Sequence, residues 1–246
     1  MKRKTLVLAL TLFFSATVFA SAQIPKTIIQ GGSQEEYKPG EFAVAKRTIA
    51  QSAGVYHFGE SEGESDFIVL PYKAGLIVQV SGHLWGTDPR TGSETWLKEF
   101  KTYNQVILKG SKFEFGKYSG IFAVYSGKIK KAILLNGDPS SEQVYLKDTV
   151  EVGHYETNLT TYFDNKKYPE VSLRVIDEKY LSGKSRSELK YMRNEVFAMY
   201  GFIFKDPVTA ALFNKRYIPW KKDVLSCLTD IEKSNLKVIM EFEKRI

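Results

Sequence analysis

Acidic residues are concentrated in the segment GESEGESD at 59–66, where Glu60, Glu62, Glu64 and Asp66 occupy alternate positions. Alternate residues of an extended strand lie on one face, and several carboxylates on one face can bind calcium. The spacing of an EF-hand calcium loop, with its closing glutamate, is absent. We favour a solvated turn or sheet edge over a calcium site, because charged edges prevent strands of different molecules from pairing.

The histidines match no catalytic or metal-binding motif. His57, His83 and His154 lie far apart and show neither HExxH nor a Cys/His ligand spacing. A nucleophile elbow, a phosphate-binding loop and a dinucleotide fingerprint are also absent. We therefore expect no catalytic residues, no metal, no cofactor and no enzymatic activity. An enzyme with a dispersed site is a third hypothesis, which a cleft holding two carboxylates, or His57 beside an acid and a hydroxyl, would support.

The candidate binding residues lie near the C-terminus and are Arg193, Asn194, Glu195, Tyr200 and Trp220. Arg193 and Tyr200 share one stripe of a predicted helix, so Arg193 is expected to pair with an acid, the last helix being one source. A ligand contact is the alternative for this arginine. Trp220 stands in YIPWKK, and a tryptophan beside basic residues suits stacking on a sugar or contact with an anionic polymer. Closure of the core is the alternative for Trp220.

The N-terminus has the pattern of a signal peptide. A basic start at 2–4 and an apolar run at 6–19 precede the small residues 20–22, with Gln23 as the expected mature start. No later stretch approaches ~20 apolar residues, so we expect no membrane span after cleavage. The protein is expected to be exported, to the periplasm or the cell exterior. Cys227 is the single cysteine, and we favour a buried thiol over pairing between chains.

The net charge gives little evidence for a polyanion partner. The chain carries a formal charge of +7, but three basic residues belong to the predicted signal peptide. Up to Ile176 the mature chain is balanced, and after it 14 basic residues face 10 acidic ones. A small excess of interspersed charge is typical of a solvated surface. An exported protein is also not expected to meet nucleic acid.

The first two thirds of the mature chain show the pattern of a β domain at 41–170. Residues 23–40 are rich in glycine and proline and predict a flexible arm, and 41–53 can form a short helix. From Gly54 apolar residues alternate in short segments, and DPRTG at 88–92 is a strong turn signal. Short strands at this spacing favour an antiparallel barrel or sandwich. A last alternating segment, 171–176, predicts a strand that leads into a second domain.

The β domain carries many aromatic residues that can fill a core or line a ligand cavity. We favour filling of the core, and a cavity for one small apolar ligand is the alternative. The residues are Tyr56, Phe58, Phe67, Tyr72, Trp85, Trp96, Phe100, Phe113, Phe115, Phe122 and Tyr125.

From 177 to 246 the apolar period becomes helical. Ser185 with Glu188 forms a capping box, and Gly201 is expected to end that helix with Phe202 folding back onto it. Asp206-Pro207 predicts the start of a second helix, and Thr229 with Glu232 the start of a third. These three amphipathic helices predict a compact helical domain.

This C-terminal region resembles the YARHG domain, a small bacterial domain that is predicted to be extracellular. The resemblance covers about 180–245, and it departs inside the naming motif, where Met199 and Tyr200 replace the usual arginine and histidine. The family supplies no established activity. The matching residues are Leu189, Met192, Arg193, Asn194, Glu195, Phe197, Ala198, Gly201, Phe202, Phe204, Phe213, Trp220, Leu228, Glu232, Asn235 and Glu243.

The sequence thus predicts an α+β protein with an antiparallel barrel or sandwich followed by a three-helix domain that resembles YARHG. The leading hypothesis is an exported, non-enzymatic binding protein of the bacterial cell envelope whose C-terminal domain contacts a cell-wall or other surface component. The alternative is a carrier that encloses a small apolar ligand inside the β domain. Fold and export alone do not decide between them.

Overall fold

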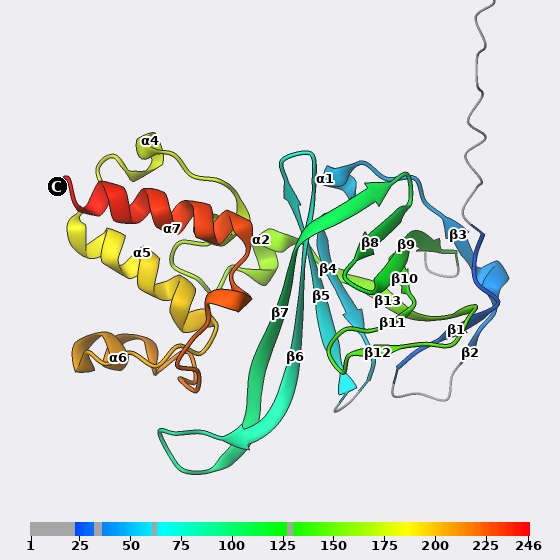
Figure 1. Cartoon of the computed structure of the whole chain (residues 1–246), viewed down its shortest axis with the longest axis horizontal. Coiled ribbons are helices and arrows are strands. Elements are labelled where there is room, and N and C mark those ends of the chain that lie inside the picture. The colour runs from blue at the N-terminus through cyan, green and yellow to red at the C-terminus, as the bar shows by residue number, and fades with distance from the viewer. Residues whose placement is uncertain (1–22, 32–35, 61–62, 127–129) are drawn as a thin grey trace, which may run out of the picture.

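The computed structural model describes residues 23–31, 36–60, 63–126 and 130–246. The predicted signal peptide and Glu62 lie outside these residues. Within them the chain forms a β-barrel followed by a helical unit (Figure 1), which confirms the predicted α+β class.

Eight antiparallel strands of the described chain form the barrel. The barrel closes because β13 pairs with β10 through Ile133 and Gly153 and with β4 through Gly153 and Phe58. In spatial order the strands are β4 (Gly54–Phe58), β5 (Ser65–Tyr72), β6 (Gly75–Thr87), β7 (Glu94–Lys109), β8 (Lys112–Phe115), β9 (Tyr118–Tyr125), β10 (Lys130–Leu135) and β13 (Thr149–Thr157).

Aromatic side chains fill the barrel interior. The ring centroid of Phe113 lies 6.1 Å from that of Phe67 and 4.8 Å from that of Phe122, so the interior rings are in mutual contact. This packing supports core filling over a ligand cavity for these residues. The buried interior rings are Tyr56, Phe58, Phe67, Phe113, Phe115, Tyr118 and Phe122.

The N-terminal segment is attached to the barrel by strands. Where the sequence analysis expected a flexible arm at 23–40, β1 (Thr27–Ile29) pairs in parallel with β13, and β2 (Glu36–Tyr37) pairs with β1. The expected helix over 41–53 is mostly wrong, because β3 (Phe42–Val44) pairs with β9 and only α1 (Ile49–Ser52) is helical. Backbone pairing to exposed barrel strands prevailed over the weak local helical pattern.

The helical unit begins directly after the barrel. Its elements are α2 (Leu159–Tyr162), α3 (Glu170–Leu173), α4 (Glu178–Leu181), α5 (Arg186–Met199), α6 (Pro207–Phe213), the 3-10 turn η3 (Leu225–Cys227) and α7 (Asp230–Glu243). The strand predicted at 171–176 is wrong, because α3 covers its first half, the residues after Leu173 are neither helix nor strand, and Val171 and Ile176 are buried in the helical core.

The capping signals of the sequence are confirmed. Ser185 and Thr229 accept hydrogen bonds from the backbone N–H groups of Glu188 and Glu232, and Asp206 caps α6. Gly201 has a φ of +77°, a region that glycine adopts readily. The N–H of Phe202 donates to the carbonyl of Phe197, and their ring centroids are 5.9 Å apart. The fold-back predicted for this helix end is therefore present.

The helical unit packs against the outer face of the barrel on strands β4 to β7 (Figure 1). Side chains alternate along β5, so that Phe67 and Val69 point into the barrel while Ile68 and Leu70 join the helical core. Each fully buried aliphatic side chain contributes about 1.5–3 kcal/mol. The barrel residues in the shared core are Val55, Ile68, Leu70, Ile77 and Phe100.

Candidate functional site

A buried polar network joins the barrel to the helical unit at Tyr200, one of the candidate binding residues. Tyr200 Oη donates to Glu232 Oε2 at 2.6 Å and accepts from Gln79 Nε2 at 2.9 Å. Ser172 Oγ donates to Glu232 Oε1 at 2.5 Å and accepts from Lys166 Nζ at 2.6 Å. Burial lowers the pKa of Lys166, opposed by Glu232, and raises the pKa of Tyr200 well above its ordinary value. The residue that replaces the family's usual histidine therefore serves the contact between the two parts.

Two further candidate residues make internal contacts. Arg193 Nε lies 3.3 Å from Glu243 Oε2 on α7, so the predicted ion pair with the last helix is confirmed. The Glu195 side chain is 2% exposed and accepts from the backbone N–H groups of Lys167 and Tyr168. These two positions stabilise the helical unit, and a direct role in binding stays a prediction.

Asn194 and Trp220 differ from these residues because each lines a hollow in the surface. Asn194 is 6% exposed and lines a pocket between α5 and α6. Trp220 is half-buried and lies in a groove between the helical unit and the barrel. A Cβ at Gly201 would lie 2.5 Å from Trp220 Cδ1, so the glycine permits the close approach of this indole. Trp220 is therefore the candidate that the fold places in the interdomain groove.

The groove has a volume of about 320 Å³, at the lower end of the range of ligand pockets, about 300–1,000 Å³. One wall comes from the hairpin of β6 and β7, and the opposite wall from α2 and the segment between α6 and η3. The aromatic residues that line it are Trp96, Phe100, Tyr162, Phe163, Tyr217 and Trp220. Ala198, Met199 and Gly201 of the naming-motif segment also line it.

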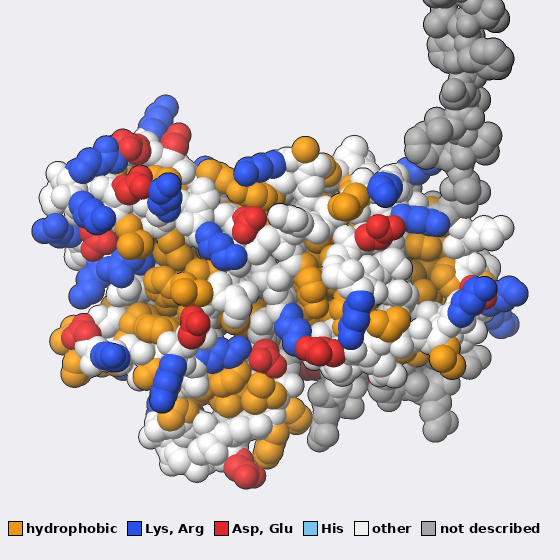
Figure 2. Space-filling view, viewed as in Figure 1, with side chains coloured by type: hydrophobic (Ala, Val, Ile, Leu, Met, Phe, Trp, Pro, Cys, Tyr) orange, Lys and Arg blue, Asp and Glu red, His pale blue; other side chains and the backbone are white. Residues whose placement is uncertain are grey.

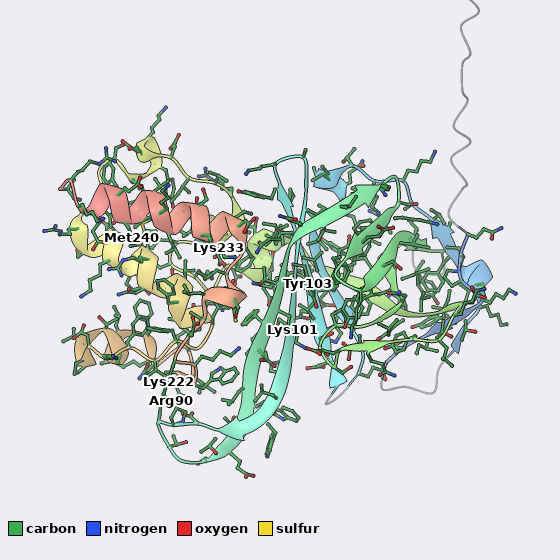
Figure 3. The ribbon with its side chains drawn as sticks, viewed as in Figure 1. Arg90, Lys101, Tyr103, Lys222, Lys233 and Met240 are labelled. Carbon is green, nitrogen blue, oxygen red and sulfur yellow. The ribbon has the colours of Figure 1, made fainter. Side chains whose placement is uncertain are left out.

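The hairpin contacts the helical unit on both sides of the groove. At the base, Gln79 Nε2 donates to the carbonyl of Cys227 at 3.0 Å. At the tip, the Arg90 guanidinium donates to the Asn214 carbonyl and binds both carboxylate oxygens of Asp88. Figure 3 shows Arg90 at the end of the hairpin on the side of the helical unit. The hairpin, which forms one wall of the groove, is thus attached to the helical unit both at its base and at its tip.

An exposed tryptophan pair extends the aromatic surface beyond the groove. Trp85 and Trp96 lie opposite each other on β6 and β7, with ring centroids 4.8 Å apart, and are 55% and 40% exposed. Both were expected among the aromatic residues of the β domain that fill its core or line a cavity, and they do neither inside the barrel. With Trp220 they are the three tryptophans of the chain. Large exposed rings gathered at one place are typical of an interaction site.

The groove carries positive charge. Lys98 Nζ lies 3.1 Å from Tyr162 Oη, and Arg216 Nη1 lies 3.4 Å from Glu195 Oε1 with half of its side chain exposed. Among the described residues that line the groove there is no carboxylate. Figure 2 shows lysine and arginine side chains among the hydrophobic ones where the hairpin meets the helical unit.

A second cleft of about 230 Å³ lies on the other face of the hairpin and holds Glu64, Glu99 and Asp138. This is a cleft with two or more carboxylates, the feature named above for an enzyme. Each of the three carboxylates has a polar partner. His57 lies 3.7 Å from Glu64, Lys221 lies 3.5 Å from Glu99, and the Ser140 hydroxyl donates to Asp138 at 2.6 Å. Such contacts favour a structural role for these acids.

His57 lies at the edge of this region. Its Nδ1 is 3.1 Å from Asp66 Oδ1, and this hydrogen bond raises the pKa of His57. Of the alternating acids at 59–66, Glu64 and Asp66 therefore contact a histidine, while Glu60 accepts from Gln30. In the described part of the chain no three His, Cys, Asp or Glu residues are grouped as metal ligands.

The fold defines a two-part protein with a filled barrel and a docked helical unit. The YARHG domain model matches residues 160–244, so the C-terminal part is a YARHG domain, as the sequence resemblance indicated. The N-terminal part matches no family model. No curated protein and no solved structure matches the chain. YARHG domains occur in exported proteins, and no helix in the described residues is long and apolar enough to cross a membrane.

Sequence reasoning missed most of the groove. Lys98 and Arg216 were not candidate residues, and Trp96 was expected only as one of the aromatic residues of the β domain, because their proximity depends on how the hairpin meets the helical unit. One signal was available: Trp85 and Trp96 lie at nearly equal distances on the two sides of the turn DPRTG. In an antiparallel hairpin such residues pair across the strands.

Proposed function

We propose that this is an exported, non-enzymatic protein that binds a component of the bacterial cell envelope in the groove between the barrel and the YARHG domain. The lining of the groove carries the proposal: six aromatic rings and two cationic side chains, with no carboxylate among the described residues there. Rings provide stacking surfaces and the cations attract an anionic partner. This lining suits a ligand, and its described residues include no nucleophile paired with a base.

Three observations support an envelope location. Residues 2–22 have the pattern of a signal peptide, YARHG domains occur in exported proteins, and the tryptophan pair is exposed rather than packed in a core. We place the ligand in the groove rather than in the barrel, because the interior rings are packed against one another.

Co-sedimentation tests the proposal. The chain without its predicted signal peptide is mixed with insoluble envelope material at low and high salt, and the bound fraction is measured. We expect binding that persists in part at high salt, because stacking is not screened. Trp96→Ala and Lys98→Ala are expected to reduce it. Leu146→Ala is the matched control for the apolar change, because Leu146 is 86% exposed on the barrel.

Absence of sedimentation at both salt concentrations would overturn the proposal. Binding that disappears at high salt and does not respond to Trp96→Ala would reduce the interaction to general electrostatic attraction and would also overturn it. Far-ultraviolet circular dichroism of each variant checks that the fold is intact.

A further inference from the structure

We infer that the ligand of the groove is a sugar polymer whose units carry an anionic group, an inference that rests on the proposed function. Three features of the groove support it: the stacking surface, the availability of the two cationic groups to a ligand, and the spacing of the side chains along β7.

The stacking surface is extended rather than a closed cage. The Trp96 ring faces the groove and also contacts Trp85 outside it, with ring planes inclined at 73°. Trp220 supplies a ring on the opposite wall. A chain of several sugar rings fits such a surface, because each ring has an apolar face that stacks on an indole. A single small ligand in the groove would not reach the outer ring, Trp85, which lies outside the groove lining and whose indole N–H donates to Glu94 at 3.2 Å.

Lys98 supplies a fixed positive charge next to Trp96. Its Nζ lies 5.3 Å and 5.5 Å from the ring centroids of Tyr162 and Phe100 and 3.1 Å from Tyr162 Oη. Within the described residues no carboxylate forms a salt bridge with it. The two rings and the Tyr162 hydroxyl therefore hold the ammonium group in position, and its charge is available to bind an anionic ligand.

Arg216 adds a second charge on the facing wall. One of its terminal nitrogens is 3.4 Å from Glu195, and the side chain is 48% exposed. A guanidinium carries five N–H donors, so one ion pair leaves others free to bind an anion. The two cations therefore come from both walls of the groove.

The spacing of side chains along β7 relates the ring to the charge. Trp96 and Lys98 lie on one face of the strand, and such neighbours are about 6.8 Å apart along it. A sugar ring stacked on Trp96 can therefore present an acidic substituent to Lys98. Both a carboxylate and a phosphate group satisfy this geometry.

Tryptophan fluorescence tests the inference directly, because all three tryptophans lie in or next to the groove. The protein is titrated with a galacturonic acid trimer, with a neutral N-acetylglucosamine trimer and with the neutral trimer after phosphorylation. We expect a charged trimer to bind at least tenfold more tightly than the neutral one. Lys98→Ala should weaken that binding about tenfold, and Lys98→Arg should largely retain it. Lys130→Ala, an exposed lysine on β10, is the matched control.

The outcomes separate the inference from the proposed function. Binding of either charged trimer that depends on Lys98 supports the inference and identifies the anion. Equal binding of the neutral trimer, or charged binding that is unaffected by Lys98→Ala, overturns it. If no trimer binds while the protein still sediments with envelope material, the inference fails and the proposed function stands. If no trimer binds and the protein does not sediment with envelope material, the inference and the proposed function are both overturned.

Discussion

The side-chain amide of Gln79, on the outer face of the barrel, donates a hydrogen bond of 2.9 Å to the phenol of Tyr200, at the end of helix α5. Gln79 is 1% exposed and Tyr200 is 1% exposed, so the contact is excluded from water. It connects the barrel to the position at which the YARHG motif usually has a histidine. The departure from the motif thus coincides with the contact between the two parts of the protein.

Removing the phenol should weaken the fold. In Tyr200→Phe, Glu232 loses a donor in a buried site and Gln79 loses an acceptor, so we expect a loss of about 1–3 kcal/mol in the free energy of unfolding. Urea denaturation measures it. Tyr180→Phe is the matched control, because the Tyr180 hydroxyl donates to Glu170 at 3.0 Å in a half-buried site. Equal losses in the two variants would contradict this account of the interface.

Gly201 should be more sensitive to substitution than another glycine with the same backbone conformation. Gly201 and Gly183 have φ values of +77° and +87°, but only a Cβ at Gly201 would meet Trp220, at 2.5 Å. Both alanine variants should lose about 1 kcal/mol from the left-handed backbone. We expect Gly201→Ala to lose about 1–3 kcal/mol more, because the indole must move. Thermal unfolding of the two variants compares them, and identical midpoints would show that the contact with Trp220 is not restrictive.

The contact between His57 and Asp66 should make stability depend on pH. The hydrogen bond with Asp66 raises the pKa of His57, with Glu64 and Glu156 acting in the same direction and burial against it. A raised pKa means that the stabilisation is complete below the ordinary value of 6.5 and is lost as the pH rises through the folded-state pKa. Asp66→Asn should therefore destabilise the protein at about pH 5.5 and have a smaller effect at about pH 8.5.

Nuclear magnetic resonance titration of His57 and urea denaturation at the two pH values check this prediction. In a His57→Gln background, Asp66→Asn should lose its pH dependence. A loss of stability in Asp66→Asn that is the same at both pH values would show that the aspartate acts independently of the histidine.

The attachment of the hairpin tip should depend on Arg90. Arg90→Ala removes the donor to the Asn214 carbonyl and the partner of Asp88. Backbone hydrogen exchange between Trp85 and Trp96 should then become faster, by roughly two- to fivefold for an exposed contact. Exchange in the barrel interior should not change. Arg186→Ala, at an exposed position at the start of α5, is the matched control. Unchanged exchange at the tip would show that the turn alone fixes the hairpin.

Local features were predictable because their signals act over a few residues. The capping box at Ser185, the left-handed Gly201 and the cap at Asp206 each depend on neighbours within one helical turn. The strands of the barrel were visible as alternation, although it could not show that residues 94–109 form one long strand. The YARHG resemblance was likewise carried by residues at fixed spacing within the helical region.

The groove was decided by the tertiary structure. Trp96, Lys98 and Trp220 line one groove because the outer face of β6 and β7 packs against the helical unit, a contact between segments more than 100 residues apart. The segment 171–176, in which alternation predicted a strand, instead begins within α3 and contributes Val171 to the helical core. The sequence alone determined the helix ends, the antiparallel all-β class of the N-terminal part, with barrel and sandwich both open, and the family of the C-terminal part. Which rings were buried and which formed a binding surface depended on docking, because burial is a property of surfaces that meet in space.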